Sequence, residues 1–317
     1  MSEQPFPIDV VISWVDGDDP AFKERRKQYL PAGADKQDDI AGATRYRSVG
    51  EIEYCVASIR RFAPWVRNIF IVTDRQVPDL QFSPISSVKI VDHTAIFSGY
   101  EHCLPTFSSR AIETMLWRIP GLSEHFIYFN DDCALIRSVT PEYFFQEGKS
   151  VCYAHWFSLL VARLLHALKP KRNGHKPVGY KDGQVRAAAV LGERRRFIYL
   201  THSPLALRRS VMETFYAGHP EVMAQNIRYR FRHQDQYNPQ ELYYLLAHRQ
   251  GLCKVVSAKG KVLYLKPRGG EGYVEKKLLR FDSEPGAFCC CINSLDQASE
   301  ADRQKVKEWL DKKILKA

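Results

Sequence analysis

Apolar and polar residues alternate along the first half of the chain in blocks that predict strands followed by helices. Four short, nearly continuous apolar runs are typical of buried parallel strands. These runs are 8–15, 68–73, 88–91 and 126–129. Two further segments repeat apolar residues every three or four positions, so each predicts an amphipathic helix. These helices are 52–62, which Pro64 ends, and 111–119, which Ser108-Ser109 open and Pro120-Gly121 close.

The pattern changes after residue 150. There we expect helices over 157–168, 205–216 and 239–249, and strands over 196–201 and 254–265, the last with a turn at Gly260. Val306, Trp309, Leu310 and Ile314 predict one apolar face of a terminal helix, and lysines occupy its other face. That helix would either dock on the domain or lie on an anionic membrane surface.

Strands that alternate with helices predict an α/β fold, with a mostly parallel sheet flanked by helices. In such sheets ligands bind beyond the carboxyl ends of the strands. The residues at three of these ends are Asp16-Gly17, Asp74-Arg75 and Asn130-Asp131-Asp132. We therefore expect the acidic side chains of three strands to share one edge of the sheet.

Charge is the unusual feature of the composition. The 317 residues are 45% hydrophobic and 26% charged, which is ordinary for a globular protein and excludes a wholly disordered or fibrous chain. The formal net charge is +10, and ten lysines and arginines lie between residues 163 and 196 against two acids. Such a stretch attracts phosphates on nucleic acid, lipid or an anionic polymer, or it is only a solvated loop.

The eight cysteines favour reduced thiols over disulfides or zinc. Residues 289–291 are three consecutive cysteines, a spacing that rarely achieves disulfide geometry, and the sequence contains no CxxC pair. The first residues show no signal peptide, and no apolar run is long enough for a membrane span. We expect a cytoplasmic protein, associated at most peripherally with the inner membrane.

Three residue types in this chain suit phosphate chemistry. The paired carboxylates of Asp131 and Asp132 suit a hard cation with oxygen ligands. The guanidinium groups of Arg45, Arg230 and Arg232 suit bidentate phosphate contacts. His102 and His202 can accept a proton at neutral pH. Each type taken alone is more often structural than functional.

Four blocks of residues, in this order, resemble one family. The first is IDVVISWVDG at 8–17, and the second is 45–51 with 58–59, 63–66 and 71–76. The third joins 104–109, 111–113, 118–123 and 129–132, and a looser fourth joins His202, Pro204, 230–232 and 242–244. This order resembles the Stealth family, the sugar-1-phosphate transferases of bacterial capsule synthesis and of lysosomal-enzyme tagging with GlcNAc 1-phosphate.

The resemblance implies a reaction and a set of roles. A capsular polysaccharide phosphotransferase of this kind moves hexose 1-phosphate, for example GlcNAc 1-phosphate, from a UDP-hexose to a sugar hydroxyl and releases UMP. Mg²⁺ or Mn²⁺ would bind Asp131 and Asp132, His202 would be the base with His102 second, and Arg230 or Arg232 would neutralise phosphoryl oxygens. The residues that would contact substrate are Asp16, Gly17, Arg45, Arg75, Ser108 and Asn130.

The resemblance also implies a nucleotide-sugar transferase fold, Rossmann-like or GT-A-like, with a helical and basic insertion. We divide it into a nucleotide-sugar-binding core at 1–150, a basic insertion with the rest of the core at 151–250, and a strand pair with an amphipathic helix at 251–317. The partners would be the UDP-hexose donor and an anionic capsular polysaccharide, held by Lys169, Lys171 and Arg172, with membrane or capsule-machinery association at most peripheral and no nucleic acid.

Two alternatives stay open at this point. The first is a metal-dependent GT-A-type glycosyltransferase that releases UDP, in which 130–132 would be the metal-binding motif. The second is a protein without enzymatic activity that binds polyanions through its basic stretch. Against the second, the sequence shows no helix-turn-helix, zinc-finger or aromatic RNA-binding signature.

Overall fold

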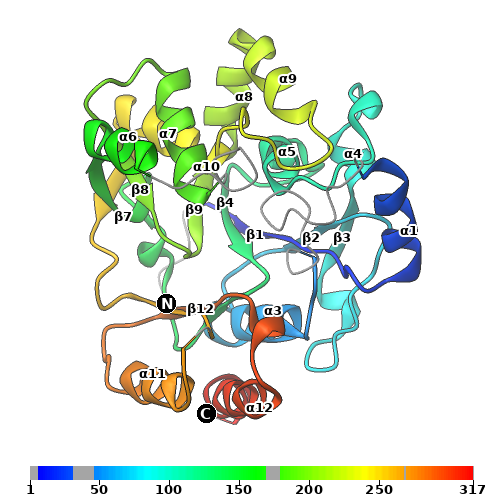
Figure 1. Cartoon of the computed structure of the whole chain (residues 1–317), viewed down its shortest axis with the longest axis vertical. Coiled ribbons are helices and arrows are strands. Elements are labelled where there is room, and N and C mark those ends of the chain that lie inside the picture. Colours follow the sequence, from blue (N-terminus) through cyan, green and yellow to red (C-terminus); the bar gives the residue numbers. More distant parts are fainter. Residues whose placement is uncertain (1–5, 31–45, 169–178, 268, 317) are drawn as a thin grey trace.

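The computed structural model describes residues 6–30, 46–168, 179–267 and 269–316. Its centre is a five-stranded sheet in the order β3-β2-β1-β4-β9 (Figure 1). The strands are β1 (Ile8–Ser13), β2 (Ile69–Thr73), β3 (Lys89–Asp92), β4 (His125–Asn130) and β9 (Leu205–Arg208). The first four run parallel and β9 runs antiparallel to β4. The predicted mostly parallel sheet is confirmed, and its parallel strands have the Rossmann-like order 3-2-1-4.

Helices cover both faces of this sheet, which explains why its strands read as continuous apolar runs. Val10 and Ile12 of β1 pack in one core with α3 (Glu51–Phe62). Val11, on the opposite face of the same strand, packs in a second core with α5 (Ser109–Met115). Both faces are therefore buried, and the ends of the strands are where the sheet can meet a ligand.

Two smaller sheets flank the central one. One contains β6 (Phe145–Gln146), β7 (Lys149–Ser158), β8 (Arg196–Leu200) and β10 (Cys253–Val256). The other contains β5 (Cys133–Leu135), β11 (Val262–Leu265) and β12 (Cys289–Ile292), with β12 antiparallel to β5 and parallel to β11. Because β5 directly follows the acidic end of β4, this last sheet brings residues near the C-terminus to that end.

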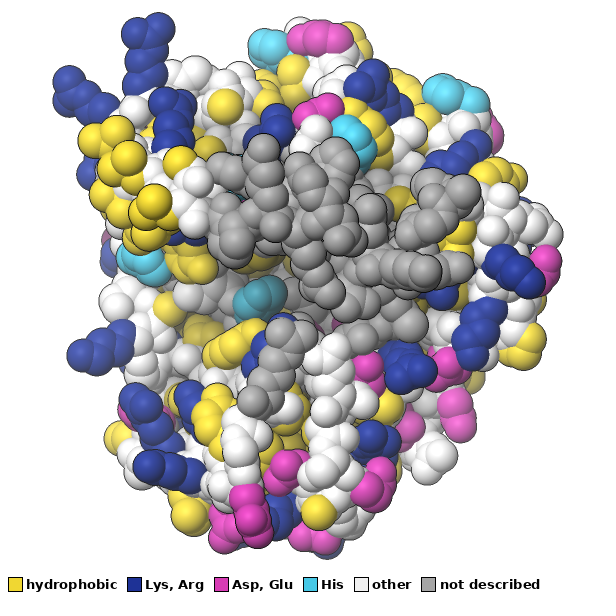
Figure 2. Space-filling model, in the orientation of Figure 1, with side chains coloured by type: hydrophobic (Ala, Val, Ile, Leu, Met, Phe, Trp, Pro, Cys, Tyr) yellow, Lys and Arg dark blue, Asp and Glu magenta, His cyan; other side chains and the backbone are white. Residues whose placement is uncertain are grey.

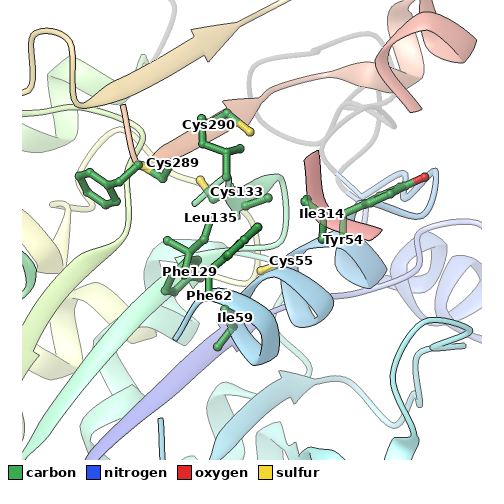
Figure 3. Packing of buried hydrophobic residues seen from close by; sticks show 14 of the residues in the cluster. Tyr54, Cys55, Ile59, Phe62, Phe129, Cys133, Leu135, Cys289, Cys290 and Ile314 are labelled. Atoms are coloured by element: carbon green, nitrogen blue, oxygen red, sulfur yellow. The ribbon is translucent and has the colours of Figure 1, made fainter. Parts of the chain in front are cut away.

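Cysteines form part of the packing around β5 and β12. Cys133, Leu135, Cys289 and Cys290 lie above α3 and belong to the same core as its residue Phe62 (Figure 3). All eight cysteines are buried and free. This agrees with the expectation of reduced thiols, and it shows that the run at 289–291 is a central strand of a small sheet.

The remaining helices surround the three sheets (Figure 1). They are α1 (Pro20–Tyr29), α4 (His93–Ile96), α6 (Leu159–Ala167), α7 (Tyr180–Val190), α8 (Arg209–Gly218), α9 (Pro220–Ile227), α10 (Pro239–Arg249), α11 (Tyr273–Asp282) and α12 (Glu300–Leu310). In α12 and the turn after it, Val306, Trp309, Leu310 and Ile314 are buried. Docking, one of the two placements expected for the terminal helix, is the one observed. Among the described residues, no helix has the length and apolarity to cross a bilayer.

Some expected elements differ from the structure. The helix expected over 205–216 is wrong at its start, because Leu205–Arg208 is a strand that pairs with β4 before α8 begins. The expected strand pair at 254–265 is two strands that turn at Gly260 but join different sheets. The helices α1, α7 and α11 and the strand β12 were not predicted. The division at residues 150 and 250 stays a prediction.

Candidate active site

Acidic residues follow β1, β2 and β4 at one edge of the central sheet. The three strands are parallel neighbours, so Asp16, Asp74 and Asp131 come after strand ends that point the same way (Figure 1). The expected gathering of strand ends is therefore present. The three ends differ in how their carboxylates are partnered.

The carboxylate at the end of β2 is paired with a cation from α1. Arg25 donates from Nε and Nη2 to Asp74 Oδ2 at 3.2 and 3.1 Å, and Asp74 is buried. The neighbouring Arg75 has a positive φ of 56° and an exposed side chain, and its backbone N–H donates to Asp92 Oδ2. Arg25 therefore balances the charge of Asp74 at the end of β2, and Arg75 contributes a hydrogen bond from its backbone N–H.

The residues after β1 form hydrogen bonds with two other segments of the chain, at Gln76 and at Tyr46. Asp16 exchanges two 2.9 Å backbone hydrogen bonds with the side-chain amide of Gln76, and Asp16 Oδ1 accepts the N–H of Asp18 at 2.8 Å. Gly17 donates to the carbonyl of Tyr46 at 2.6 Å, and a Cβ at position 17 would lie 2.4 Å from that oxygen. Only glycine allows this approach. Arg45, the next predicted contact, lies outside the described residues.

The end of β4 carries carboxylates without a cationic partner. Asp131 and Asp132 lie near Glu51, the first residue of α3, in a pocket also lined by Tyr54 and Leu295. We call Asp131, Asp132 and Glu51 the acidic cluster. Among the described residues no lysine, arginine or histidine forms a salt bridge with any of the three. Asn130 lies beside them and accepts a hydrogen bond from Tyr128 on its side-chain oxygen at 3.0 Å.

Burial and neighbouring charges change the protonation of two members of the acidic cluster, Asp131 and Glu51. Burial, then the charges of Asp132 and Glu51, raise the pKa of Asp131 well above its usual range. Burial also raises the pKa of Glu51, and the charges of Asp132 and Asp296 add to the effect. Raised carboxyl pKa values in a pocket are typical of a functional site.

Asp132 is held by the third sheet. Its Oδ2 accepts a hydrogen bond from Asn293 Nδ2 at 2.9 Å, and its Oδ1 accepts one from the thiol of Cys133 at 3.6 Å. The sulfurs of Cys133 and Cys291 and a carboxylate oxygen of Asp132 all lie within 4.8 Å of one another. The hydrogen bond with Cys133 and burial raise the pKa of Cys291 well above its usual value, so this thiol is protonated.

The donor set at this end of β4 fits a hard cation. Mg²⁺ prefers carboxylate oxygens, of which the acidic cluster offers several, and it retains water on its other positions. The two thiols are poor ligands for such an ion while they are protonated. The predicted metal residues, Asp131 and Asp132, are thus of the chemical type that Mg²⁺ and Mn²⁺ bind, and Glu51 lines the same pocket.

His202 lies between two tyrosine rings. Its ring stacks on Tyr180 with centroids 4.8 Å apart and on Tyr264 with centroids 5.5 Å apart. Burial lowers the pKa of His202, the charge of Asp132 opposes this, and the charges of Lys266 and Arg232 add to it. The imidazole is therefore neutral at pH 7, and it lies within electrostatic reach of Asp132.

The two candidate arginines occupy different surroundings. Arg232 donates to Ser109 Oγ at 2.9 Å, and burial lowers its pKa against the opposing charge of Glu113. Arg230 donates to the carbonyl of Pro105 at 2.9 Å, and its guanidinium lies over the ring of Tyr29. The charge of Arg232 also lowers the pKa of His202, so Arg232 lies within electrostatic reach of this histidine.

Two other predicted residues make contacts elsewhere. His102 is exposed on the short turn Glu101–Cys103, where its nearest aromatic neighbour is Tyr100 at 6.4 Å. Ser108 is 1% exposed and its hydroxyl donates to Gln236 Oε1 at 2.9 Å. A fully buried hydroxyl with a protein partner positions the chain, so direct contact of Ser108 with a substrate has no support in this geometry.

Several residues of the site were not singled out from the sequence. Glu51 was the last residue of the first segment of the second block, 45–51, and its position at the start of a helix facing a strand end could have pointed to it. Asn293, Tyr180 and Tyr264 carried no such signal. They come from segments without a matched motif and reach the site only through the pairing of β12 with β5 and through the stacking on His202.

Comparison with known proteins identifies the class. Residues 6–34 match the family model of Stealth protein CR1, conserved region 1, and residues 45–153 match that of Stealth protein CR2, conserved region 2. The second match includes Glu51, Asp131 and Asp132, and residues 104–132, read above as a separate third block, fall inside it. The α/β fold described above therefore contains two conserved regions of the Stealth proteins. The chain belongs to the Stealth family.

Curated relatives carry related names. An exopolysaccharide phosphotransferase of Nocardia farcinica is 32% identical over 307 residues, which are 94% of this chain and 57% of that protein. The exopolysaccharide phosphotransferase SCO6021 of Streptomyces coelicolor is 37% identical over 75% of this chain and 43% of its own length. The capsular polysaccharide phosphotransferase WcwK of Streptococcus pneumoniae is 41% identical over 44% of this chain and 42% of its own. The chain spans about half the length of these relatives.

Solved structures show a more distant likeness. The galactosyltransferase LgtC, solved with donor and acceptor sugar analogues, is 9% identical, with a TM-score of 0.46 over 96% of this chain and 95% of that one. Mouse xyloside xylosyltransferase 1 is 12% identical, with a TM-score of 0.41 over 91% and 98%. We draw no inference about donor or reaction from similarity at this level.

Proposed function

We propose that this chain is a hexose-1-phosphate transferase of capsule or exopolysaccharide synthesis. It takes a UDP-hexose and an acceptor hydroxyl on a sugar polymer, and it forms a phosphodiester with release of UMP. The observation that carries the proposal is the acidic cluster at the end of β4, with the neutral His202 in electrostatic reach of Asp132 and the half-buried Arg232 in reach of His202. The names of the curated relatives support the same chemistry.

The acidic cluster provides the place for a cation. Asp131 and Asp132 would hold Mg²⁺ or Mn²⁺, with Glu51 beside them, and a bound cation balances the charge of the donor pyrophosphate. Asn293 keeps Asp132 Oδ2 in a fixed direction through its 2.9 Å hydrogen bond. The hexose donor would lie along the same sheet edge, over the ends of β1 and β4, where Asp16, Gly17 and Asn130 are found.

His202 is the proposed base. The acceptor hydroxyl attacks the phosphorus that bears the sugar while its proton passes to the neutral imidazole of His202. An O–P bond forms, the bridging P–O bond breaks, and the bond's electron pair leaves with UMP. The two tyrosine rings fix the plane of the His202 ring, so the nitrogen that accepts the proton is held in one orientation.

Arg232 would stabilise the phosphoryl oxygens during transfer. A buried guanidinium is a strong partner for a phosphoryl group, because little water competes with it. Its hydrogen bond to Ser109 leaves further N–H groups of the fork for phosphate. Between the two arginines left open by the sequence, we propose Arg232 for this role and a structural role for Arg230, which braces the loop at Pro105.

The test is an analysis of the products. The purified protein is incubated with Mg²⁺, a set of UDP-hexoses and a capsule oligosaccharide, and the nucleotide and sugar products are identified by mass spectrometry. We expect UMP and a phosphodiester-linked hexose, both dependent on acceptor. Release of UDP with a simple glycoside would instead establish an ordinary glycosyltransferase, and nucleotide release without acceptor would indicate hydrolysis only.

A further inference from the structure

Helix α6 exposes most of its apolar side chains. Only Leu159 and Ala162 of this helix are buried. Five large apolar side chains of α6 and the residue after it are exposed: Leu160 67%, Val161 43%, Leu164 57%, Leu165 48% and Leu168 80%. The helix itself is well defined, since Ser158 caps its first turn by accepting the N–H of Val161. Its apolar surface is therefore presented by a formed helix.

This concentration is unusual for the molecule. The described residues include thirteen exposed large hydrophobic side chains, and five of them lie within 160–168. Of the other eight, four lie in the longer segment 77–90 and four are isolated in the sequence. Figure 2 shows the yellow side chains gathered where Figure 1 places α6, bordered by dark blue lysine and arginine side chains. A contiguous apolar patch of this kind indicates a binding surface.

Arginines border the exposed leucines. Arg163 lies on α6 itself, and the start of β8 adds Arg194, Arg195 and Arg196, all exposed. The two segments are joined directly, because Leu159 donates its N–H to the carbonyl of Arg195 at 3.0 Å and Ser158 pairs with Arg196. We call α6 with Leu168 and these three arginines the α6 surface.

Two acids near the α6 surface are paired with other side chains than its arginines. Glu193 pairs with Arg249 at 2.5 Å, and Asp182 pairs at 2.9 Å with His166, which lies on α6. In the ranges that the structure describes, neither Arg194 nor Arg195 pairs with a carboxylate. The surface therefore combines leucines that are exposed to water with cations that lack counterions.

We propose that the α6 surface docks this protein on bilayers that contain anionic phospholipid. At about 1.5 Å per residue, the nine residues of α6 are far too short to cross a bilayer. They suit a helix that lies in the headgroup plane, with leucines directed into the acyl boundary and arginines at the phosphates. This inference is independent of the reaction proposed above.

Charge complementarity distinguishes this occupant from two others. A soluble phosphodiester polymer would contact the arginines and leave the leucines in water. A second copy of the chain would cover the leucines and bring two clusters of arginines together, which is electrostatically unfavourable. An anionic bilayer satisfies both parts of the surface at once.

Vesicle flotation tests the proposal. The full chain is mixed with vesicles of phosphatidylcholine alone or of phosphatidylcholine with phosphatidylglycerol, and the bound fraction is measured. We expect binding to the anionic vesicles to exceed that to neutral ones by about tenfold, and to fall as salt is added. Absence of binding to the anionic vesicles would overturn the proposal.

Substitutions on the α6 surface locate the contact. Leu160→Gln combined with Leu164→Gln should weaken vesicle binding by about tenfold or more, because the inserted apolar side chains are lost. The matched control is Leu279→Gln on α11, whose side chain is equally exposed at 65% and should bind like the wild type. Arg194→Gln with Arg195→Gln should weaken binding to anionic vesicles only, with Arg280→Gln as the control.

Two further readouts keep the outcome decisive. In a Leu164→Trp variant, the fluorescence in excess of that from the five native tryptophans should shift to the blue when anionic vesicles are added. This readout does not depend on a loss of binding. Sedimentation with and without the leucine substitutions examines self-association. If the leucine substitutions leave vesicle binding intact, the proposal is wrong. The proposal is also wrong if the only effect of the leucine substitutions is to dissociate a dimer. It is equally wrong if the arginines bind only a soluble polyanion such as polyphosphate.

Discussion

Strands β2 and β4, which run parallel on either side of β1, both end in acidic residues, but the fold surrounds these residues differently. Asp74 after β2 is buried against Arg25, so its charge is balanced within the fold. Asp131 and Asp132 after β4 crowd against Glu51 and have no cationic partner in the described structure. The comparison teaches that an acidic strand end becomes a candidate site only where the fold leaves its charge unbalanced.

The surroundings of the two ends reinforce this difference. Near Asp74, burial lowers the pKa of His93 to about 4, so the histidine is neutral and the Arg25–Asp74 pair is the charged contact. Near Asp132, the closest hydrogen-bond donors are the neutral side chains of Asn293 and Cys133. We therefore assign stability to the end of β2 and cation-dependent chemistry to the end of β4.

Removing the charge of Asp132 should give the largest effect. Asp132→Asn keeps the shape and an acceptor for Asn293, but it removes one carboxylate from the proposed cation site. We expect kcat/KM for UMP release to fall on the order of 10³-fold. The midpoint of urea unfolding should stay the same or rise, since a repulsive charge is lost. Asp18→Asn, an exposed acid in the loop after β1, is the control; equal activity in both variants would contradict the assignment.

Lowering the pH should destabilise the fold at the end of β2, because the buried His93 is neutral when folded. The pKa of His93 is about 4 when folded and about 6.5 when unfolded, so the unfolded chain binds the extra proton between these values. The free energy of unfolding should therefore decrease as pH falls from 6.5 to 4, by about 3 kcal/mol from this residue. Urea unfolding against pH should be flatter for His93→Gln than for the wild type, and parallel curves would rule the contribution out.

Breaking the pair at the end of β2 should cost stability and spare the chemistry. Arg25→Ala leaves Asp74 buried without its cation, and we expect the free energy of unfolding to drop by about 2 kcal/mol. Lys23 lies on the same helix as Arg25 and forms an exposed pair with Asp18. Lys23→Ala should change the free energy of unfolding by less than about 1 kcal/mol. Activity per folded molecule should be preserved in both. A loss of turnover in Arg25→Ala without a loss of stability would reverse the comparison.

The smallest expected effect concerns Asn293. Asn293→Ala removes the hydrogen bond that directs Asp132 Oδ2, so we expect kcat/KM to fall by about tenfold. Because Asn293 positions a ligand rather than binding the cation itself, raising the Mg²⁺ concentration should restore part of the rate. A rate that is unchanged, or a loss that excess Mg²⁺ does not affect, would remove Asn293 from the site.

Sequence reasoning found the parts of this architecture that depend on local pattern. The buried strands β1, β2 and β4 were recognisable because both their faces are covered, and Asp131 and Asp132 followed as residues at a strand end. The helix over 157–168 was also recognisable, but periodicity could not show that its leucines face outward. An apolar stripe looks the same whether it meets a core or a membrane.

The missed parts depend on contacts between distant segments. Arg25 lies 49 residues from Asp74, and Asn293 lies 161 residues from Asp132. Nothing in the local sequence of α1 or β12 signals these partners. The three consecutive cysteines were predicted only to be reduced thiols, and nothing indicated that they form the strand that carries Asn293 to the site. Which strand-end acid is balanced could therefore be decided only from the fold.

Calorimetric titration with Mg²⁺ in the presence of a UDP-hexose tests the central claim most directly. The measurement compares the wild type with Asp132→Asn and Asp18→Asn, and it reports binding whether or not an acceptor has been found. The account predicts saturable Mg²⁺ binding in the wild type and in Asp18→Asn, and its loss in Asp132→Asn. Equal Mg²⁺ binding in all three proteins, or none in the wild type, would contradict it.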